Sequence, residues 1–233
     1  MTQEEMLGRL LYRDGLMLVV DKPAGLPVHR GPKGGEAFED YFDALRFGLP
    51  RPPALAHRLD RDTTGCLVLG RHRKALALLG KLFKQGKVGK CYWAVVEGGP
   101  EDPEGSIDIP LSKRDESRGW WMKADKHGLP SVSLWKVLGR GSELTWLGLE
   151  PVTGRTHQLR VHCAEMGWPI VGDSIYGKSP RLGGPALHLH SREVTVPISK
   201  NKPAVKVAAP VPEHMRDTLS ACGWAGEVNR AAP

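Results

Sequence analysis

Residues 57–65 read "HRLDRDTTG", and the apolar run "CLVLG" follows directly at residues 66–70. The first segment holds two carboxylates that are two positions apart, two arginines and a histidine. A protein core accepts such charges only when each is paired, so this segment predicts either a solvated loop or a functional site. The apolar run predicts a buried strand that begins where the loop ends.

Length and composition predict an ordinary globular chain. Its 233 residues suit one large domain, and 40% of them are hydrophobic while 25% are charged. We expect a single catalytic domain over residues 1–221 and a flexible tail over residues 222–233. No apolar run approaches the length of a membrane span, and the N-terminus is too acidic for a signal peptide. The expected location is therefore the cytoplasm, without membrane contact.

Charge and cysteine usage narrow the classes of partner. The four cysteines form no CxxC pair, so neither a zinc site nor a disulfide framework is expected. The net charge of +7 and the pI near 9.3 favour a polyanionic partner. Between Thr63 and Val96 the chain holds seven lysines and arginines and no acid. That segment is the first candidate for contact with phosphate groups.

Within this basic segment, residues 74–86 have the apolar period of a helix with one buried stripe. Gly86 is the expected end of the helix. Lys74, Lys81 and Lys84 would then point away from the core. The expected buried stripe comprises Ala75, Leu78, Leu79 and Leu82.

Elsewhere the chain alternates short apolar runs with loops. With 28 glycines and 19 prolines, it predicts a loop-rich α/β protein. Strands are expected at residues 17–20, 65–71 and 91–98, a hairpin at 133–139 and 144–151, and a helix at 156–167.

A second polar motif, "GRTHQLRVH", occupies residues 154–162. If a helix starts at His157, Arg160 lies one turn along and shares its face. A buried arginine needs a carboxylate, and Asp60 lacks an obvious partner near it in the sequence. Two dense polar motifs, each flanked by core-like segments, predict one cleft lined from both sides.

The segment "DRDTTG" also allows a rival interpretation, because it looks like the DxDxT signature of haloacid-dehalogenase-type phosphotransferases. That chemistry needs its first aspartate at the end of an apolar strand, where Mg²⁺ and backbone amides hold a phosphoryl group. Here the preceding residues, "AHRL", include two cationic types, and no later acidic pair completes a metal site. A Mg²⁺-dependent phosphatase is therefore the weaker interpretation.

Together the motifs resemble the RluA-type pseudouridine synthases. "HRLDRDTTG" is similar to the family's HRLDxxTSG signature, and "GRTHQLRVH" matches its GRTHQ-[IL]-R-x-H motif almost letter for letter. "VVDKPAGLPVH", "KCYWAVVEG", "PIVGDSIYG" and "ALHLHSREVTVP" follow the family's order. The resemblance runs from residue 11 to residue 211 and departs at Thr64, where serine is usual.

The resemblance implies an isomerase that detaches uracil from its ribose in RNA, turns it and rejoins it through carbon 5. It implies an α+β fold, a mixed and largely antiparallel sheet with flanking helices and loops around a central cleft. It implies no cofactor and no metal. About ten residues precede the first motif, so no N-terminal RNA-binding module is expected. The expected substrate is then a stem-loop of ribosomal or transfer RNA, bound by a monomer without an obligate protein partner.

The resemblance also assigns roles residue by residue. Asp60 matches the essential aspartate, as nucleophile or as base, and Tyr92 matches the tyrosine that stacks on the target base. Arg160 matches the arginine that pairs with the aspartate, and Arg58 the arginine that enters the RNA helix where the base has left. Extruding a base costs a few kcal/mol, and the planar guanidinium of Arg58 suits the vacated space.

The remaining candidates contact RNA or order the site. Lys74, Lys81, Lys84, Lys90 and Arg155 are expected to bind phosphate. The histidines of both motifs are expected to be hydrogen-bonded structural residues, and Lys22 to order its turn. A catalytically inactive RNA-binding protein of the same fold is a third interpretation, which the intact Asp60, Tyr92 and Arg160 argue against.

Overall fold

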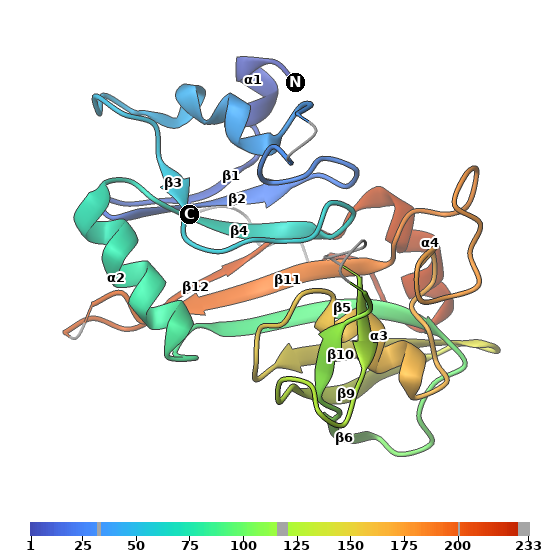
Figure 1. The fold of residues 1–233 in the computed structure, drawn as a ribbon. Coiled ribbons are helices and arrows are strands. Elements are labelled where there is room, and N and C mark those ends of the chain that lie inside the picture. The colour runs from blue at the N-terminus through green and yellow to red at the C-terminus, as the bar shows by residue number, and fades with distance from the viewer. Residues whose placement is uncertain (32–33, 116–120, 200, 228–233) are drawn as a thin grey trace. The chain divides into compact units, whose positions relative to one another are not determined.

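The computed structural model describes residues 1–31, 34–115, 121–199 and 201–227 (Figure 1). The chain folds as two compact units, each built from two separate stretches. Unit 1 comprises Met1–Cys91 and Ser191–Ala209, and unit 2 comprises Tyr92–His190 and Pro210–Pro233. Two boundaries fall inside strands, β5 (Gly89–Glu97) and β11 (Leu189–Val196). The expectation of one domain over residues 1–221 stays a prediction.

Unit 1 is made of short strands and helices. Besides its parts of β5 and β11, it contains α1 (Gln3–Leu7), β1 (Leu10–Arg13), β2 (Met17–Lys22), the 3-10 helix η1 (Phe38–Leu45), β3 (Ala54–Leu55), β4 (Thr64–Gly70), α2 (Arg73–Lys84) and β12 (Val205–Ala208). Strand β2 pairs with β1 and β4, β3 pairs with β4, and β11 pairs with β12, all antiparallel.

The core of unit 1 explains why its central strands read as unbroken apolar runs. Every residue of β4 is buried, as expected of a strand that is covered on both faces. Helix α2 packs its apolar stripe onto one of those faces. The shared core includes Met17, Val19, Cys66, Val68, Leu79 and Leu82.

Unit 2 has an antiparallel sheet with a helix on each face. Besides its parts of β5 and β11, it contains β6 (Glu104–Asp108), β7 (Leu111–Lys113), β8 (Met122–Ala124), β9 (Val132–Arg140), β10 (Leu144–Pro151), α3 (Gln158–Glu165) and α4 (Glu213–Ala221). The strand order is β5-β10-β9-β6, and β7 pairs with β8. Because neighbouring side chains of a strand point to opposite faces, Ala94 and Val96 pack toward α3 while Val95 packs toward α4.

Most expected elements are present. The strands, the hairpin β9–β10 and the helices α2 and α3 lie where the apolar runs predicted them. Gly86 and Gly167 have φ of +65° and +86°, which glycine adopts without strain just after a helix. The prediction for Leu78 was wrong: the residue is 37% exposed, because it lies on the flank of the buried stripe. The expected mixed, largely antiparallel α+β fold is confirmed.

The expectation of a flexible tail over residues 222–233 stays a prediction, and the structure describes contacts made by its first residues. Cys222 is buried beside α4, and the N–H of Trp224 donates to the carbonyl of Leu219 (3.0 Å). The N–H of Val211 donates to the carboxylate of Glu227 (2.8 Å). Cys222 and Trp224 therefore pack against the core beside α4, an apolar face that composition alone did not reveal. Residues 228–233 lie outside the described residues.

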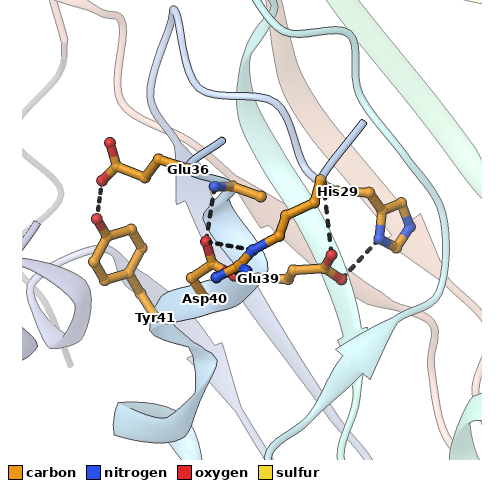
Figure 2. A network of polar contacts seen from close by, with 7 residues as sticks. His29, Glu36, Glu39, Asp40 and Tyr41 are labelled. Carbon is orange, nitrogen blue, oxygen red and sulfur yellow. Dashed lines mark hydrogen bonds and ion pairs between the residues drawn. The ribbon is translucent and has the colours of Figure 1, made fainter. Parts of the chain in front are cut away.

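Ion pairs connect the segment between β2 and η1 to the acidic residues of η1 (Figure 2). His29 bonds to Glu39 (2.7 Å), and the Nε of Arg30 donates to Asp40 (2.9 Å). Asp40 also accepts from the N–H of Ala37 (2.9 Å) and so caps η1. These pairs are exposed, so each contributes little to the free energy of unfolding.

Along the described parts of the chain, we find no helix with the length and apolar character needed to cross a membrane.

Candidate active site

Asp60 lies in the loop between β3 and β4, residues 56–63, which we call the aspartate loop. Its side chain is half-buried, whereas Arg58 is exposed. The N–H of Thr63 donates to the carbonyl of Asp60 (3.2 Å), which closes a tight turn. The loop therefore leaves Asp60 partly accessible and presents Arg58 to solvent.

Lys22 anchors the aspartate loop from the end of β2. The residue is fully buried, and its Nζ donates to the carbonyl oxygens of Pro23 (2.7 Å), Arg61 (2.7 Å) and Thr63 (3.0 Å). An ammonium group has three N–H donors, so each acceptor receives one. Two of these bonds fix the loop backbone directly after Asp60. Lys22 thus orders its own turn, as expected, and also holds the loop that carries the candidate catalytic residue.

Aspartates offset the burial of this ammonium group. Burial lowers the pKa of Lys22 from its ordinary value of 10.5 to about 7, while Asp62, Asp60 and Asp21 oppose the shift. Burial raises the pKa of Asp21 to about 6, against the charges of Arg9 and Lys22. The carboxylate of Asp60 is therefore one of the charges that favour the protonated form of Lys22.

Two glycines allow the backbone to fit around Lys22. Gly65 lies opposite Lys22 in the β2–β4 pairing and has a φ of +99°. Gly25 has a φ of +79°, and its carbonyl accepts from the Nε of Arg61 (2.9 Å). Residues with a Cβ rarely adopt such angles, so both positions favour glycine. The loop is therefore held from both β2 and the turn that follows it.

His57 is a structural residue of the aspartate loop. Its Nε2 accepts from the N–H of Val68 in β4 (2.9 Å), so the ring proton is on Nδ1. The ring stacks on Phe83 of α2, with 4.5 Å between ring centres. Burial lowers the pKa of His57 to about 3, with a smaller effect of the Lys90 charge, so the imidazole stays neutral. His57 is therefore hydrogen-bonded within unit 1, as expected of the motif histidines.

In unit 2, Arg160 forms a buried ion pair with Asp173. Its Nε and Nη2 donate to the two carboxylate oxygens at 2.7 and 2.8 Å, and 4% and 1% of the two side chains are exposed. Asp173 also accepts from the N–H groups of Ile175 (2.9 Å) and Tyr176 (3.0 Å). Burial alone would raise the pKa of Asp173, but these bonds and the Arg160 charge hold it below its usual value.

Asp173 is a residue that the sequence predictions missed. It lies in "PIVGDSIYG", which resembles a family motif, but nothing in its spacing indicates the partner of its carboxylate. The pairing of Arg160 with Asp60, which the resemblance implied, stays a prediction. What the structure describes is an arginine whose orientation is set by a bidentate carboxylate in its own unit.

Tyr176 contacts Arg160, His157 and the backbone of Met122. Its hydroxyl bonds to Nδ1 of His157 (2.8 Å) and accepts from the N–H of Met122 (2.9 Å). Its ring lies 5.3 Å from the guanidinium carbon of Arg160, within cation–π range. His157 has a φ of +52°, so the chain enters α3 through a left-handed residue that this bond supports.

A second polar network fixes the start of α3 against β9. Gln158 donates to the hydroxyl of Ser133 (2.9 Å), which in turn bonds to Nδ1 of His162 (3.0 Å). The Nε2 of His162 bonds to the carbonyl of Ile109 (3.0 Å) and therefore carries the ring proton. Burial lowers the pKa of His162, so the ring is neutral and structural.

The other expected site residues differ in their surroundings. Tyr92 is half-buried on β5, opposite Leu149, and packs against the core of unit 2. Lys74, Lys81 and Lys84 are exposed on α2, as predicted.

Two further cationic residues complete the set of expected phosphate contacts. Arg155 is exposed before α3, and its Nε donates to the carbonyl of Pro130 (3.3 Å). Lys90 is half-buried, and burial lowers its pKa. Lys90 is therefore the least suited of these residues to contact a phosphate from solvent. In the described ranges, His, Cys, Asp and Glu side chains form no group of three or more that would hold a metal ion.

Comparison with known proteins assigns this chain to a family. The family model described as RNA pseudouridylate synthase matches residues 16–165, more than half of the chain. This chain belongs to that family. The match confirms the resemblance noted in its motifs, and the family's enzymes are isomerases that form pseudouridine in RNA.

Individual relatives agree with the family. An uncharacterized RNA pseudouridine synthase of Zymomonas mobilis is 43% identical over 213 residues, which are 90% of this chain and 96% of the relative. The ribosomal large subunit pseudouridine synthase C of Haemophilus ducreyi is 34% identical, over 93% of this chain and 69% of the relative. The solved structure of human RNA pseudouridylate synthase domain containing 4 is 26% identical with a TM-score of 0.80, covering 94% of this chain and 95% of that one.

Replacing Lys22 by Met should destabilise unit 1 and slow turnover. The substitution leaves three carbonyl acceptors without their donor, and losing a buried network of this kind costs about 3 kcal/mol. Lys202→Met removes an exposed charge of the same type in unit 1 and should change the free energy of unfolding by less than about 0.5 kcal/mol. Urea unfolding of both variants, with pseudouridine formation measured beside it, makes the comparison.

The pH dependence of stability in the wild type and in Lys22→Met gives a second test. Between the folded pKa of Lys22, about 7, and its ordinary value of 10.5, the unfolded chain holds the Lys22 proton more tightly than the folded chain. Raising the pH through this window therefore adds to the stability of the wild type, and the loss caused by Lys22→Met should grow with pH. A loss that shrinks as the pH rises would contradict this account of Lys22.

The Arg160–Asp173 pair should behave as one unit in a double-mutant cycle. Arg160→Met and Asp173→Asn should each lower the free energy of unfolding by about 3 kcal/mol or more, because each leaves the other group buried without its partner. The double variant should lose less than the sum of the two, with a coupling of about 1 to 3 kcal/mol. Strictly additive losses in urea unfolding would mean that the two side chains do not stabilise each other.

Proposed function

We propose that this pseudouridine synthase converts a specific uridine of ribosomal or transfer RNA to pseudouridine, with Asp60 as the reacting group. Asp60 acts on the ribose as nucleophile or as base, and both roles need an ionised carboxylate. Tyr92 stacks on the target base, and Arg160 pairs with the aspartate. The bond between N1 of the uracil and the ribose breaks, and the uracil turns. A bond then forms between carbon 5 and the ribose, carbon 5 loses its proton and N1 gains one, so that no atom is added or lost overall and no cofactor is needed.

The observation that carries this proposal is the anchoring of the aspartate loop. Lys22 binds the loop backbone at Arg61 and Thr63 and lies in the field of Asp60, while the Asp60 side chain stays partly accessible. A reacting carboxylate must be held within a fraction of an ångström of its productive position, and a buried support of this kind supplies that.

Arg58 is proposed to stabilise the RNA after the uridine has left its stack. The residue is exposed, and the loop that carries it is held rigidly. A guanidinium group can stack in the gap and hydrogen-bond at its edge. Extrusion of the uridine costs a few kcal/mol, which this contact offsets in part.

Two features bear on the choice of RNA. The relative from Haemophilus ducreyi is named for the large ribosomal subunit, which makes ribosomal RNA the first substrate to test. The exposed lysines of α2 offer a basic face that suits the backbone of a stem-loop. A monomeric enzyme located in the cytoplasm completes the proposal.

The family assignment leaves no support for the phosphatase interpretation. A protein of this fold that binds RNA without catalysis is the alternative that the next experiment addresses.

Asp60→Asn should abolish pseudouridine formation and leave RNA binding intact, because it removes the charge that makes the carboxylate reactive while keeping its shape. Asp62→Asn is the matched control: it lies in the same loop and also acts on Lys22, but has no proposed role in the chemistry. We expect it to keep turnover within about tenfold of the wild type, or about 1.4 kcal/mol. Single-turnover assays on ribosomal RNA fragments make the measurement, and normal rates in Asp60→Asn would rule out its proposed role.

Arg58→Ala should slow modification of a structured stem-loop far more than modification of a short unstructured strand with the same uridine. The lost stabilisation should be about 1–3 kcal/mol, the scale of one base–side-chain stack. Arg61→Ala, which removes an exposed arginine of the same loop, should slow neither RNA selectively. Equal slowing of both RNAs by Arg58→Ala, together with a lower melting temperature, would instead identify Arg58 as a structural residue.

A further inference from the structure

Unit 1 contains a cationic cavity of about 610 Å³ at the end of β4 opposite to the aspartate loop. Gly70, the last residue of β4, lines it together with the start of α2. The path along the strand from Thr64 to Gly70 is about 20 Å, so the cavity is distinct from the site at Asp60. Its basic lining residues are Arg51, Arg71, His72, Arg73 and Lys74.

The lining of the cavity suits a nucleotide. No Asp or Glu lines it among the described residues, so the charged side chains that line it are all cationic. Beside the cations lie apolar side chains, Leu49, Pro50, Pro52, Ala54 and Leu76. Cations bind the phosphate of a nucleic acid, and an apolar surface accepts the face of a base or a ribose.

Two of the lining residues are held in place before any ligand arrives. The guanidinium of Arg71 donates to the carbonyl of Asp14 (2.7 Å), and its Nε is buried without a hydrogen bond within the described structure. His72 accepts from the N–H of Ala75 through Nδ1 (3.2 Å), so its Nε2 carries the ring proton and is a donor. The charge of Arg71 and the N–H donor of His72 are thus already in position, and groups that are fixed in advance lose less freedom on binding.

The first turn of α2 carries positive charge, which the helix dipole disfavours at that end. Arg73 and Lys74 begin the helix, and that turn contains no acidic residue. The N-terminus of a helix bears partial positive charge, so cations there lower stability. An anion in the adjoining cavity would relieve this repulsion.

We infer that this cavity binds one nucleotide of the substrate RNA away from the uridine that reacts, and so holds the strand at a second point. The phosphate lies against the cations, and the base or ribose lies over the apolar side chains. The identity of the RNA as substrate rests on the proposed function, whereas the binding of RNA at this cavity can be measured without turnover.

The test compares two triple variants that each remove three exposed charges. The cavity triple is Arg51→Gln, Arg73→Gln and Lys74→Gln, and the matched control is Lys126→Gln, Lys136→Gln and Lys202→Gln. The probe is a fluorescein-labelled poly-uridine strand of about 20 nucleotides, long enough to pass between the two sites. Fluorescence anisotropy gives its affinity over a series of salt concentrations.

The cavity triple should bind this RNA about tenfold more weakly than the wild type at about 0.1 M salt, with a logarithmic salt dependence flatter by about 2. The control triple should change affinity by less than about threefold. The melting temperature of the cavity triple should equal or exceed that of the wild type, because the substitutions remove cations from the start of α2.

Equal losses of affinity in the two triples, or an unchanged salt dependence in the cavity triple, would overturn the inference. A selective loss in the cavity triple would support it even if the wild type formed no pseudouridine, an outcome that defeats only the proposed function. Pseudouridine formation by the wild type together with equal losses in the two triples would defeat only the cavity.

Discussion

A buried ammonium group bonded to three carbonyl oxygens holds the loop on which the proposed chemistry depends. Moving a charged group out of water is unfavourable by several kcal/mol, and Lys22 is fully buried. Its three acceptors and the aspartates around it offset part of that penalty. A hydrophobic residue at this position would bury more easily but would leave the loop backbone without donors. The backbone that follows Asp60 is thus held by buried polar contacts.

Unit 2 uses the same principle with different groups. Arg160 and Asp173 are buried together, and two backbone N–H groups complete the hydrogen bonding of the carboxylate. Gln158, Ser133 and His162 form a second buried network at the same helix. Polar networks with every member paired are rigid and specify one arrangement. Helix α3 therefore presents Arg160 in one orientation. Most residues of this helix are buried, and it has little amphipathic character.

The sequence was sufficient for what depends on local pattern and insufficient for what depends on tertiary contact. Strands such as β4 and the helix α2 could be predicted, because apolar periods bounded by glycine carry the signal. Helix α4 could not, since only Met215 and Leu219 of that helix belong to the buried core and prolines precede it. The acceptors of Lys22 are backbone carbonyls, which carry no sequence signal at all. The partner of Arg160 within unit 2, Asp173, follows from how the chain folds back, not from spacing.

Pseudouridine mapping in cells tests the central claim, that this chain forms pseudouridine in RNA through Asp60. Total RNA would be sequenced chemically from cells without the gene and from the same cells that express the wild type or Asp60→Asn at equal levels. The account predicts that one or a few pseudouridines disappear without the gene, return with the wild type and stay absent with Asp60→Asn. An unchanged pseudouridine map in cells without the gene, or full restoration by Asp60→Asn, would contradict it.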